Sequence, residues 1–322
     1  MLPLFVAVIY KEYNSVVAFT IACTISIGLG IITTSILGRD EQVESLRYTD
    51  SYFIVSFAWI MSSVLAAIPF VIQGSIPNVF DAFFEMCSGF STTGATILTD
   101  VEALPKSMLL WRSETQWLGG MGIIVLMVAL VPNLGVKAQN VASAETPGPT
   151  VTKLTSRFSD TARNLYIAYV ILTVILIALL LFGGMNMFDA VAHSFSTMAT
   201  GGFGIYNDSI AHFHSYYITW IITIFMIIAG TNFNLFFTMI GGKIKTVLAD
   251  EELRLYVAIL VISTSLITIS LFSQEGYKST FKAITDAAFQ VATMISTTGY
   301  ATIDFNLWPA FCKMVLILVM FT

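Results

Sequence analysis

Three short segments of the sequence repeat one pattern whose residues could coordinate a cation. Each segment reads Asp-Ala, nine intervening residues, Thr, then Thr or Gly, then Gly, and ends on Ala, Phe or Tyr. The copies run from the aspartate to the second-last residue, a glycine, over 81–94, 189–202 and 286–299. Backbone carbonyl groups from several such loops can replace the hydration shell of a monovalent cation, and glycine allows backbone geometries that side chains forbid. The pattern therefore predicts an ion-coordinating loop that occurs in triplicate.

The spacing within each copy predicts how the loop is held. Eleven residues lead from the aspartate to the threonine, which corresponds to about 16 Å of α-helix, half of a membrane's hydrocarbon layer. We expect a short pore helix followed by a re-entrant extended segment, which membrane proteins tolerate only where it lines a cavity or is buried in protein. We expect Asp81, Asp189 and Asp286 to cap the positive ends of these helices. The negative C-terminal ends would then favour a cation at the pore axis.

The composition indicates which elements position these loops. Of the 322 residues, 56% are hydrophobic and 11% are charged, whereas soluble domains carry about 25% charged residues. Apolar stretches, most of them long enough to cross a bilayer as helices, lie at 13–37, 51–72, 106–131, 164–183, 215–240, 254–273 and 307–322. The predicted fold class is an all-α polytopic membrane protein, in which M1–pore loop–M2 units repeat around a central cation pore.

The distribution of basic residues predicts the orientation. Nine of the fifteen Lys and Arg residues fall in the segments 38–50, 132–163 and 241–254, so the positive-inside rule places these in the cytoplasm and the three pore loops outside. The expected domains are an N-terminal extension helix with its cytoplasmic link (1–50), repeat 1 (51–131, pore loop 77–105), a connector (132–163), repeat 2 (164–240, pore loop 187–214), a connector (241–253) and repeat 3 (254–322, pore loop 277–306).

Several polar residues near the pore loops allow two interpretations. Arg112 and Glu114 interrupt the start of an apolar stretch, which indicates an ion pair at the outer interface or a role at the pore mouth. An aspartate follows each loop, and these acids either enrich cations in a vestibule or only terminate the loops; they are Asp100, Asp208 and Asp304. The histidines His193, His212 and His214 have no converging Cys or acidic pattern, so no metal site is expected beyond potassium at the filter.

The repeated loops resemble those of the Trk/Ktr/HKT superfamily of potassium transporters, and are most similar to the bacterial TrkH/TrkG branch. The resemblance rests on SGFSTTGAT (88–96), MATGGFGIYNDSI (198–210) and TTGYATIDFNLWP (297–309). It implies four pseudo-repeats around one pore, preceded by a two-helix extension. We expect this chain to supply three of the four, to lack the fourth, and to stop inside the second helix of repeat 3.

The resemblance also implies the site residues. The selectivity filter would take its carbonyls from three residues in each repeat, namely Thr92, Thr93 and Gly94, then Thr200, Gly201 and Gly202, then Thr297, Thr298 and Gly299. Glycine at the last of these positions goes with potassium in the family, and serine in the first repeat goes with sodium permeation. Potassium, with sodium as the alternative, is thus expected as the transported ion, and no covalent cofactor is expected.

Function and partners follow as expectations. We expect potassium uptake across the inner membrane by a multi-pass protein surrounded by lipid, which forms a homodimer and binds a cytoplasmic nucleotide-binding regulatory subunit of the TrkA/KtrA type, with no nucleic acid as partner. Two alternatives remain open, namely a sodium- or proton-coupled symporter and a non-conducting truncated subunit. An enzyme is not expected, because the sequence contains neither H-E-x-x-H nor G-x-S-x-G.

Overall fold

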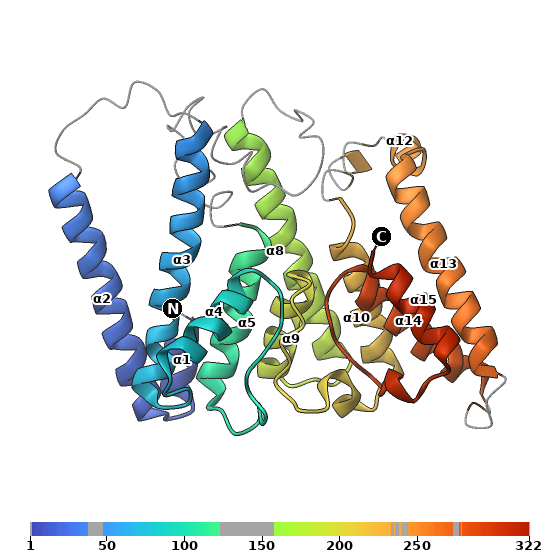
Figure 1. Cartoon of the computed structure of the whole chain (residues 1–322), viewed down its shortest axis with the longest axis horizontal. Helices are drawn as coiled ribbons and strands as arrows, with labels where there is room; N and C mark the ends of the chain where they lie inside the picture. Colours follow the sequence, from blue (N-terminus) through green and yellow to red (C-terminus); the bar gives the residue numbers. More distant parts are fainter. Residues whose placement is uncertain are drawn as a thin grey trace. The chain divides into compact units, whose positions relative to one another are not determined.

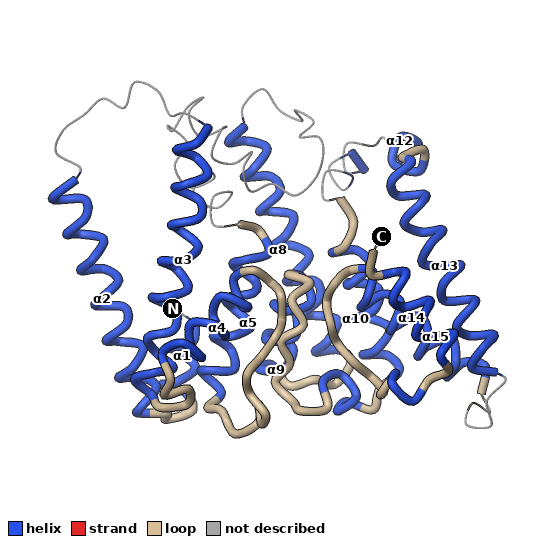
Figure 2. The backbone as a smooth tube through the Cα atoms, in the orientation of Figure 1, coloured by secondary structure: helices blue, strands red, loops and turns tan. Residues whose placement is uncertain are grey.

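The computed structural model describes residues 2–37, 48–122, 158–232, 235, 238–239, 242, 244–272, 277 and 279–321. Every regular element within these ranges is a helix (Figure 2). Most of the basic segments 38–50 and 132–163, and part of 241–254, lie outside the described residues. The chain divides into two compact units, Met1–Ser91 with Ala95–Ile167, and Thr92–Gly94 with Ala168–Thr322, and each is described by itself.

Four helices have the length and apolarity needed to cross a membrane. Their apolar parts are Tyr13–Ile36, Phe53–Gln73, Arg163–Phe182 and Glu251–Phe272, with mean hydropathy between 2.1 and 2.9. No more than a third of any of these windows is buried inside the protein, so most of the apolar surface is available to lipid. These spans confirm the predicted stretches 13–37, 51–72, 164–183 and 254–273, and with them the predicted all-α membrane fold.

The first unit surrounds one pore helix. The chain begins with α1 (Leu2–Ile9) and the spanning helices α2 (Tyr13–Leu37) and α3 (Tyr48–Gln73), and continues into α4 (Val79–Phe90) and α5 (Lys106–Gly120). The twelve-residue helix α4 packs against both α3 and α5 (Figure 1). It is the first of the predicted pore helices.

The second unit contains the other two pore helices. It comprises most of α8 (Phe158–Phe182), then α9 (Met187–Met198), η1 (Ser209–Phe213), α10 (Tyr216–Ala229), α12 (Ile244–Leu248), α13 (Glu251–Phe272), α14 (Thr280–Ile295), η2 (Phe305–Leu307) and α15 (Ala310–Val319). Helix α14 packs against α10, α13 and α15. Its buried residues Ala287 and Val291 share one apolar cluster with Leu271 of α13 and Leu316 of α15. The third pore helix is therefore enclosed by protein, as a re-entrant segment requires.

Helix α10 is shorter than its apolar stretch, 215–240, suggested. It ends at Ala229, and Gly230, Thr231 and Asn232 follow. Glycine is a weak helix former, so a helix end at this position is unsurprising. Gly230 also has no room for a side chain, because a Cβ there would lie 2.8 Å from the Tyr256 hydroxyl and 3.2 Å from the Ser296 Cβ. Among the described residues of this stretch, the helix is interrupted at 230–232, and the interruption lies against the end of pore helix α14.

Candidate functional site

All three pore helices end in the same unusual way. Their C-cap residues are Ser91, Ala199 and Ser296, and the next residue in each case is a threonine with positive φ, namely Thr92 (55°), Thr200 (51°) and Thr297 (58°). Figure 2 draws the segments that follow as loops. A β-branched residue with positive φ is a genuine outlier, so its occurrence at three matching positions marks these positions as special.

Hydrogen bonds identify the geometry in the second and third copies. After α9, Thr200 N donates to Thr197 O at 3.0 Å and Gly201 N donates to Ser196 O at 2.9 Å. The matching bonds after α14 are 3.2 Å and 2.9 Å long, and they join Thr297 N to Met294 O and Thr298 N to Thr293 O. This pair of bonds defines a Schellman motif, whose left-handed position is usually glycine.

The positive φ of the three threonines costs free energy that a glycine at the same position would avoid. A left-handed conformation costs an ordinary residue about 1–2 kcal/mol, and glycine would remove most of that cost. Backbone strain that persists in this way is concentrated at functional sites. In the third copy the Thr297 hydroxyl donates to Ser296 O at 2.7 Å, and Ser296 Oγ and Thr298 Oγ1 lie 2.7 Å apart, so hydroxyl groups order this end of the helix.

A glycine with positive φ follows two residues after each of these threonines. The φ angles are 75° at Gly94, 76° at Gly202 and 85° at Gly299. The intervening residue has no positive φ in any of the three copies, so the sign of φ alternates along each loop. Such alternation can turn consecutive carbonyl groups to one side, whereas a regular strand turns them to opposite sides. This arrangement suits the coordination of an ion by backbone oxygens.

The second and third loops approach each other closely. A Cβ on Gly202 would lie 1.9 Å from the carbonyl oxygen of Thr298, so only glycine fits there. A Cβ on Gly299 would meet nothing within 4 Å, so glycine at this position is favoured by its φ alone. The division of the chain assigns Thr92–Gly94 to the same unit as these two loops.

The caps of the pore helices differ from the prediction. The N-cap residues are Asn78, Asn186 and Ser279, and the first two accept a backbone hydrogen bond through their side chains. Asp81 and Asp189 lie in the first turn instead, where a carboxylate still complements the positive helix end. The aspartates are therefore not the N-cap residues, because the helices begin two residues before Asp81 and Asp189 and six residues before Asp286.

A tyrosine lies near the second and the third aspartate of the repeat. Asp189 Oδ2 accepts from Tyr206 Oη and from Asn186 Nδ2, at 2.9 Å and 2.8 Å. Asp286 lies further along α14, near the Tyr277 side chain. Burial, together with the nearby Asp286 carboxylate, raises the pKa of Tyr277 to about 12. Its hydroxyl therefore remains a donor at physiological pH.

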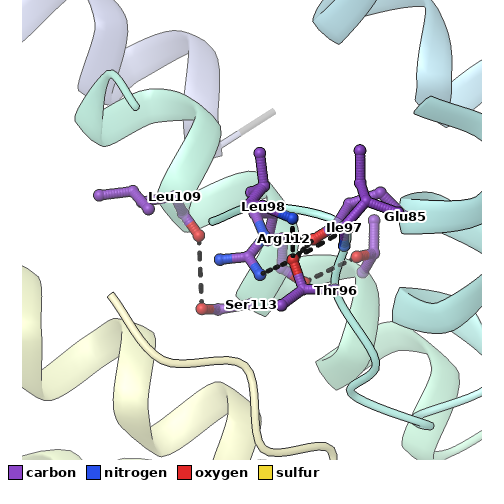
Figure 3. Close-up of polar contacts among 8 residues, drawn as sticks. Glu85, Thr96, Ile97, Leu98, Leu109, Arg112 and Ser113 are labelled. Atoms are coloured by element: carbon purple, nitrogen blue, oxygen red, sulfur yellow. Dashed lines mark hydrogen bonds and ion pairs between the residues drawn. The ribbon is translucent and has the colours of Figure 1, made fainter. Parts of the chain in front are cut away.

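A buried ion pair supports the first loop. Glu85 on α4 and Arg112 on α5 are 0% and 1% exposed, and Arg112 Nε lies 2.8 Å from Glu85 Oε1. The same carboxylate accepts from Thr96 Oγ1 at 2.9 Å and from the backbone N of Ile97 at 3.1 Å (Figure 3). The segment just after Gly94 is thus fastened to both helices that flank it.

This ion pair corrects one interpretation of the sequence. Arg112 pairs with Glu85, and the site is buried instead of exposed at an interface. Residues two apart on a helix do not face each other, so Arg112 and Glu114 point to different surroundings. Sequence reasoning missed Glu85 because it lies 27 residues from Arg112, inside an apolar helix.

A second carboxylate that sequence reasoning missed caps helix α5. The N-cap residue Pro105 makes no side-chain cap, and the Glu12 carboxylate accepts from Lys106 N at 2.8 Å and Ser107 N at 3.1 Å. These amides belong to the first turn, which has no intrahelical acceptor. The segment between α1 and α2 therefore stabilises a helix 94 residues away.

His193 occupies a buried aromatic site. Its Nδ1 lies 2.9 Å from Asp189 O, and its ring is within 6.4 Å of the rings of Tyr206, Phe213 and Tyr300, measured between centroids. Among the residues that the structure describes, no three His, Cys, Asp or Glu side chains lie close enough to hold a metal ion. Packing of pore helix α9 accounts for this histidine.

Comparisons with known proteins agree with this architecture. Residues 16–322 match the family model TrkH, described as a cation transport protein. The Trk system potassium uptake protein TrkH of Escherichia coli K12 is 38% identical over 98% of this chain, and TrkG of the same strain is 35% identical over 99%. The crystal structure of the potassium transporter TrkH from Vibrio parahaemolyticus superposes with a TM-score of 0.83 at 33% identity, and covers 98% of this chain.

The extent of the match is also informative. This chain spans 66% of the length of the two Escherichia coli proteins and 65% of the solved Vibrio chain. The family match covers residues 16–322. This range includes all three pore helices and the loops that follow them. The chain belongs to the TrkH family of cation transport proteins.

Proposed function

We propose that the protein containing this chain takes up potassium across the bacterial inner membrane through a pore, with a selectivity filter made of backbone carbonyl groups. The observation that carries the proposal is the triplicate loop, in which a left-handed threonine and a glycine with positive φ follow a pore helix. The relatives named above are potassium uptake proteins. The family is one of cation transporters, not of enzymes.

This geometry supports the filter residues that we propose. We assign ion coordination to the carbonyl groups of three residues in each loop, namely Thr92, Thr93 and Gly94, then Thr200, Gly201 and Gly202, then Thr297, Thr298 and Gly299. The C-terminal ends of α4, α9 and α14 lie directly before these residues, and the partial negative charge of a helix C-terminus favours a cation. Glycine at the third position of each loop supports preference for potassium over sodium.

The assembly is proposed on the same basis. We assign to the whole protein a fourth repeat that completes the ring of loops, a homodimeric state, and a cytoplasmic nucleotide-binding regulatory subunit of the TrkA type. The resemblance of the filter segments supports these assignments, and so do the names of the relatives, which place them in a Trk system.

Flux measurements on the full-length protein test the proposal. Reconstituted in liposomes, the protein should admit potassium and rubidium when a gradient of either is imposed, and should admit sodium much more slowly. Uptake should persist when sodium is replaced by an impermeant cation and the proton gradient is dissipated. Equal sodium and potassium fluxes would contradict the filter assignment. Uptake that stops without a sodium or proton gradient would instead support a symporter, and no flux at all would support a non-conducting subunit.

A further inference from the structure

The three pore helices differ at one buried position behind their loops. The residue four positions after the repeated aspartate is Glu85 in the first copy, His193 in the second and Gln290 in the third. All three are at most 1% exposed. The copies therefore agree where the loop is predicted to meet the ion and differ where the pore helix meets the protein.

The helix after each loop differs in a corresponding way. The seventh residue after the N-cap is Arg112 in α5, Ile222 in α10 and Leu316 in α15, and all three are buried. Helix α10 contains no charged residue. An ion pair between the pore helix and the following helix at these positions is thus a property of the first copy.

The pair in the first copy acts on the loop directly. Glu85 accepts from Thr96 and Ile97 as well as from Arg112, and Thr96 lies two residues after the filter glycine Gly94. Arg112 Nη2 also lies 3.3 Å from Thr96 Oγ1, to which it donates. One carboxylate therefore receives donors from the loop segment and from α5 together.

The matching segment of the third copy is held by other means. Ala301, two residues after Gly299, donates through its backbone N to Ser209 Oγ at 3.3 Å and accepts from Ile210 N at 3.2 Å. Ser209 and Ile210 follow the second loop. These two loops are therefore joined by one backbone hydrogen bond and one bond to a serine hydroxyl, whereas the first loop is fastened by a charged side chain of its own pore helix.

We propose that Glu85 and Arg112 are positioning residues that set the conformation of the first filter loop and thereby its discrimination between potassium and sodium. The inference rests on the proposed function of the loops as a selectivity filter. A buried ion pair is often no more stabilising than a pair of apolar side chains, so stability alone does not explain why one lies here. This ion pair places the Glu85 carboxylate where it accepts hydrogen bonds from the loop residues Thr96 and Ile97. Without the pair, the carbonyls near Gly94 would lose the fixed spacing that favours the larger ion.

The decisive variant replaces the pair of the first copy with that of the third. In the full-length protein, the double variant Glu85→Gln with Arg112→Leu leaves no unpaired buried charge, so it avoids the damage that either single change would cause. Rubidium and sodium uptake into liposomes are measured side by side, with melting in detergent as a measure of folding. We expect the potassium-over-sodium preference to fall about tenfold, which corresponds to the free energy of roughly one hydrogen bond. The protein should still fold and conduct.

Changes at Thr96 test the loop side of the same contact. Thr96→Val removes the hydroxyl that donates to Glu85, and we expect it to lower the potassium preference in the same direction. Thr96→Ser keeps the hydroxyl and should retain the preference. Thr99→Val is the matched control, because Thr99 is exposed in the same loop and is not a member of this contact.

The outcomes separate this inference from the function on which it rests. A double variant that folds and keeps the full preference, in a protein where Gly94→Ser lowers it, overturns the positioning role and leaves the filter intact. Loss of preference in Thr99→Val as well as Thr96→Val also overturns it, because any change in the loop would then suffice. Absence of selective potassium flux in the unaltered protein overturns both proposals.

Discussion

Gly202 and the carbonyl oxygen of Thr298 lie so close together that a Cβ atom on the glycine would be 1.9 Å from that oxygen. The contact joins the second and third repeats through backbone atoms of two predicted filter residues. Gly202 has positive φ, and the amide of Thr298 donates to Thr293 O at 2.9 Å. This proximity makes the two loops mechanically dependent on each other.

Replacing Gly202 with alanine should therefore abolish selective potassium flux. The new methyl group would meet a backbone atom that cannot rotate away, and alanine is also strained at a φ of 76°. Gly299→Ala should be milder, because its methyl group enters open space and only the left-handed strain of about 1–2 kcal/mol remains. Rubidium uptake into liposomes checks both. Gly184→Ala is the control, since Gly184 has the same kind of φ (91°) and open surroundings outside the filter. Equal effects at all three glycines would show that strain alone matters.

Gly94→Ser tests the filter assignment in the first repeat. We expect the ratio of potassium to sodium flux to fall while total cation flux persists, because a hydroxymethyl group changes the coordination next to the carbonyl groups. Competition between rubidium and sodium uptake measures this ratio. Gly28→Ser in α2 is a suitable control, because a Cβ there meets nothing within 4 Å. An unchanged ratio in Gly94→Ser would count against a coordinating role for this loop.

Thr200→Gly should stabilise the protein and weaken its function at the same time. Glycine is the usual residue at the left-handed position of a Schellman motif, so relief of strain should exceed the added chain entropy by about 0.5–1 kcal/mol. The loss of the hydroxyl and of the β-branched side chain should loosen the loop and lower the potassium preference. Melting in detergent gives the first effect and flux competition the second. A Thr200→Gly protein that melts lower than the unaltered protein would show that the left-handed threonine is not strained.

Glu12→Ala should loosen the start of helix α5. The carboxylate accepts from two first-turn amides of that helix, and loss of a helix cap costs about 0.5–2 kcal/mol. Hydrogen exchange of the Lys106 and Ser107 amides should accelerate, with little change in the pore helix α4. Asn14→Ala provides the comparison, because Asn14 is an exposed neighbour in the chain. Unchanged exchange at Lys106 would mean that the amides have another acceptor in the membrane.

The parts of this structure that follow from local sequence were predictable. The four long spans are evident from apolar stretches alone, because the bilayer fixes the length a helix needs. The three repeated loops could be recognised because their spacing repeats without insertion, and one copy would have carried little information. The left-handed threonines could not be foreseen, since φ depends on how the preceding helix ends and threonine disfavours that region.

The long-range contacts of Glu85 and Glu12 were missed because they join distant residues. The pair of Glu85 and Arg112 is separated by 27 positions and that of Glu12 and Lys106 by 94. A charged residue in an apolar helix signals that a partner exists, but helical spacing reveals only partners three or four residues away. The N-caps of the pore helices were predicted at the wrong residues for a related reason. The aspartates recur with fixed spacing in the repeat, whereas the N-cap residues of α4 and α9 are Asn78 and Asn186.

The matching buried position holds Glu85, His193 and Gln290 in the three repeats. This difference limits how one repeat could be substituted for another. The three repeats present matching loops, yet the buried side chains behind each loop differ. A chain rebuilt from identical copies of the first repeat would place a carboxylate and a guanidinium at these two positions behind every loop, whereas copies of the third would place an amide and an aliphatic side chain there. A repeat moved to another place in the chain would therefore need its own following helix moved with it.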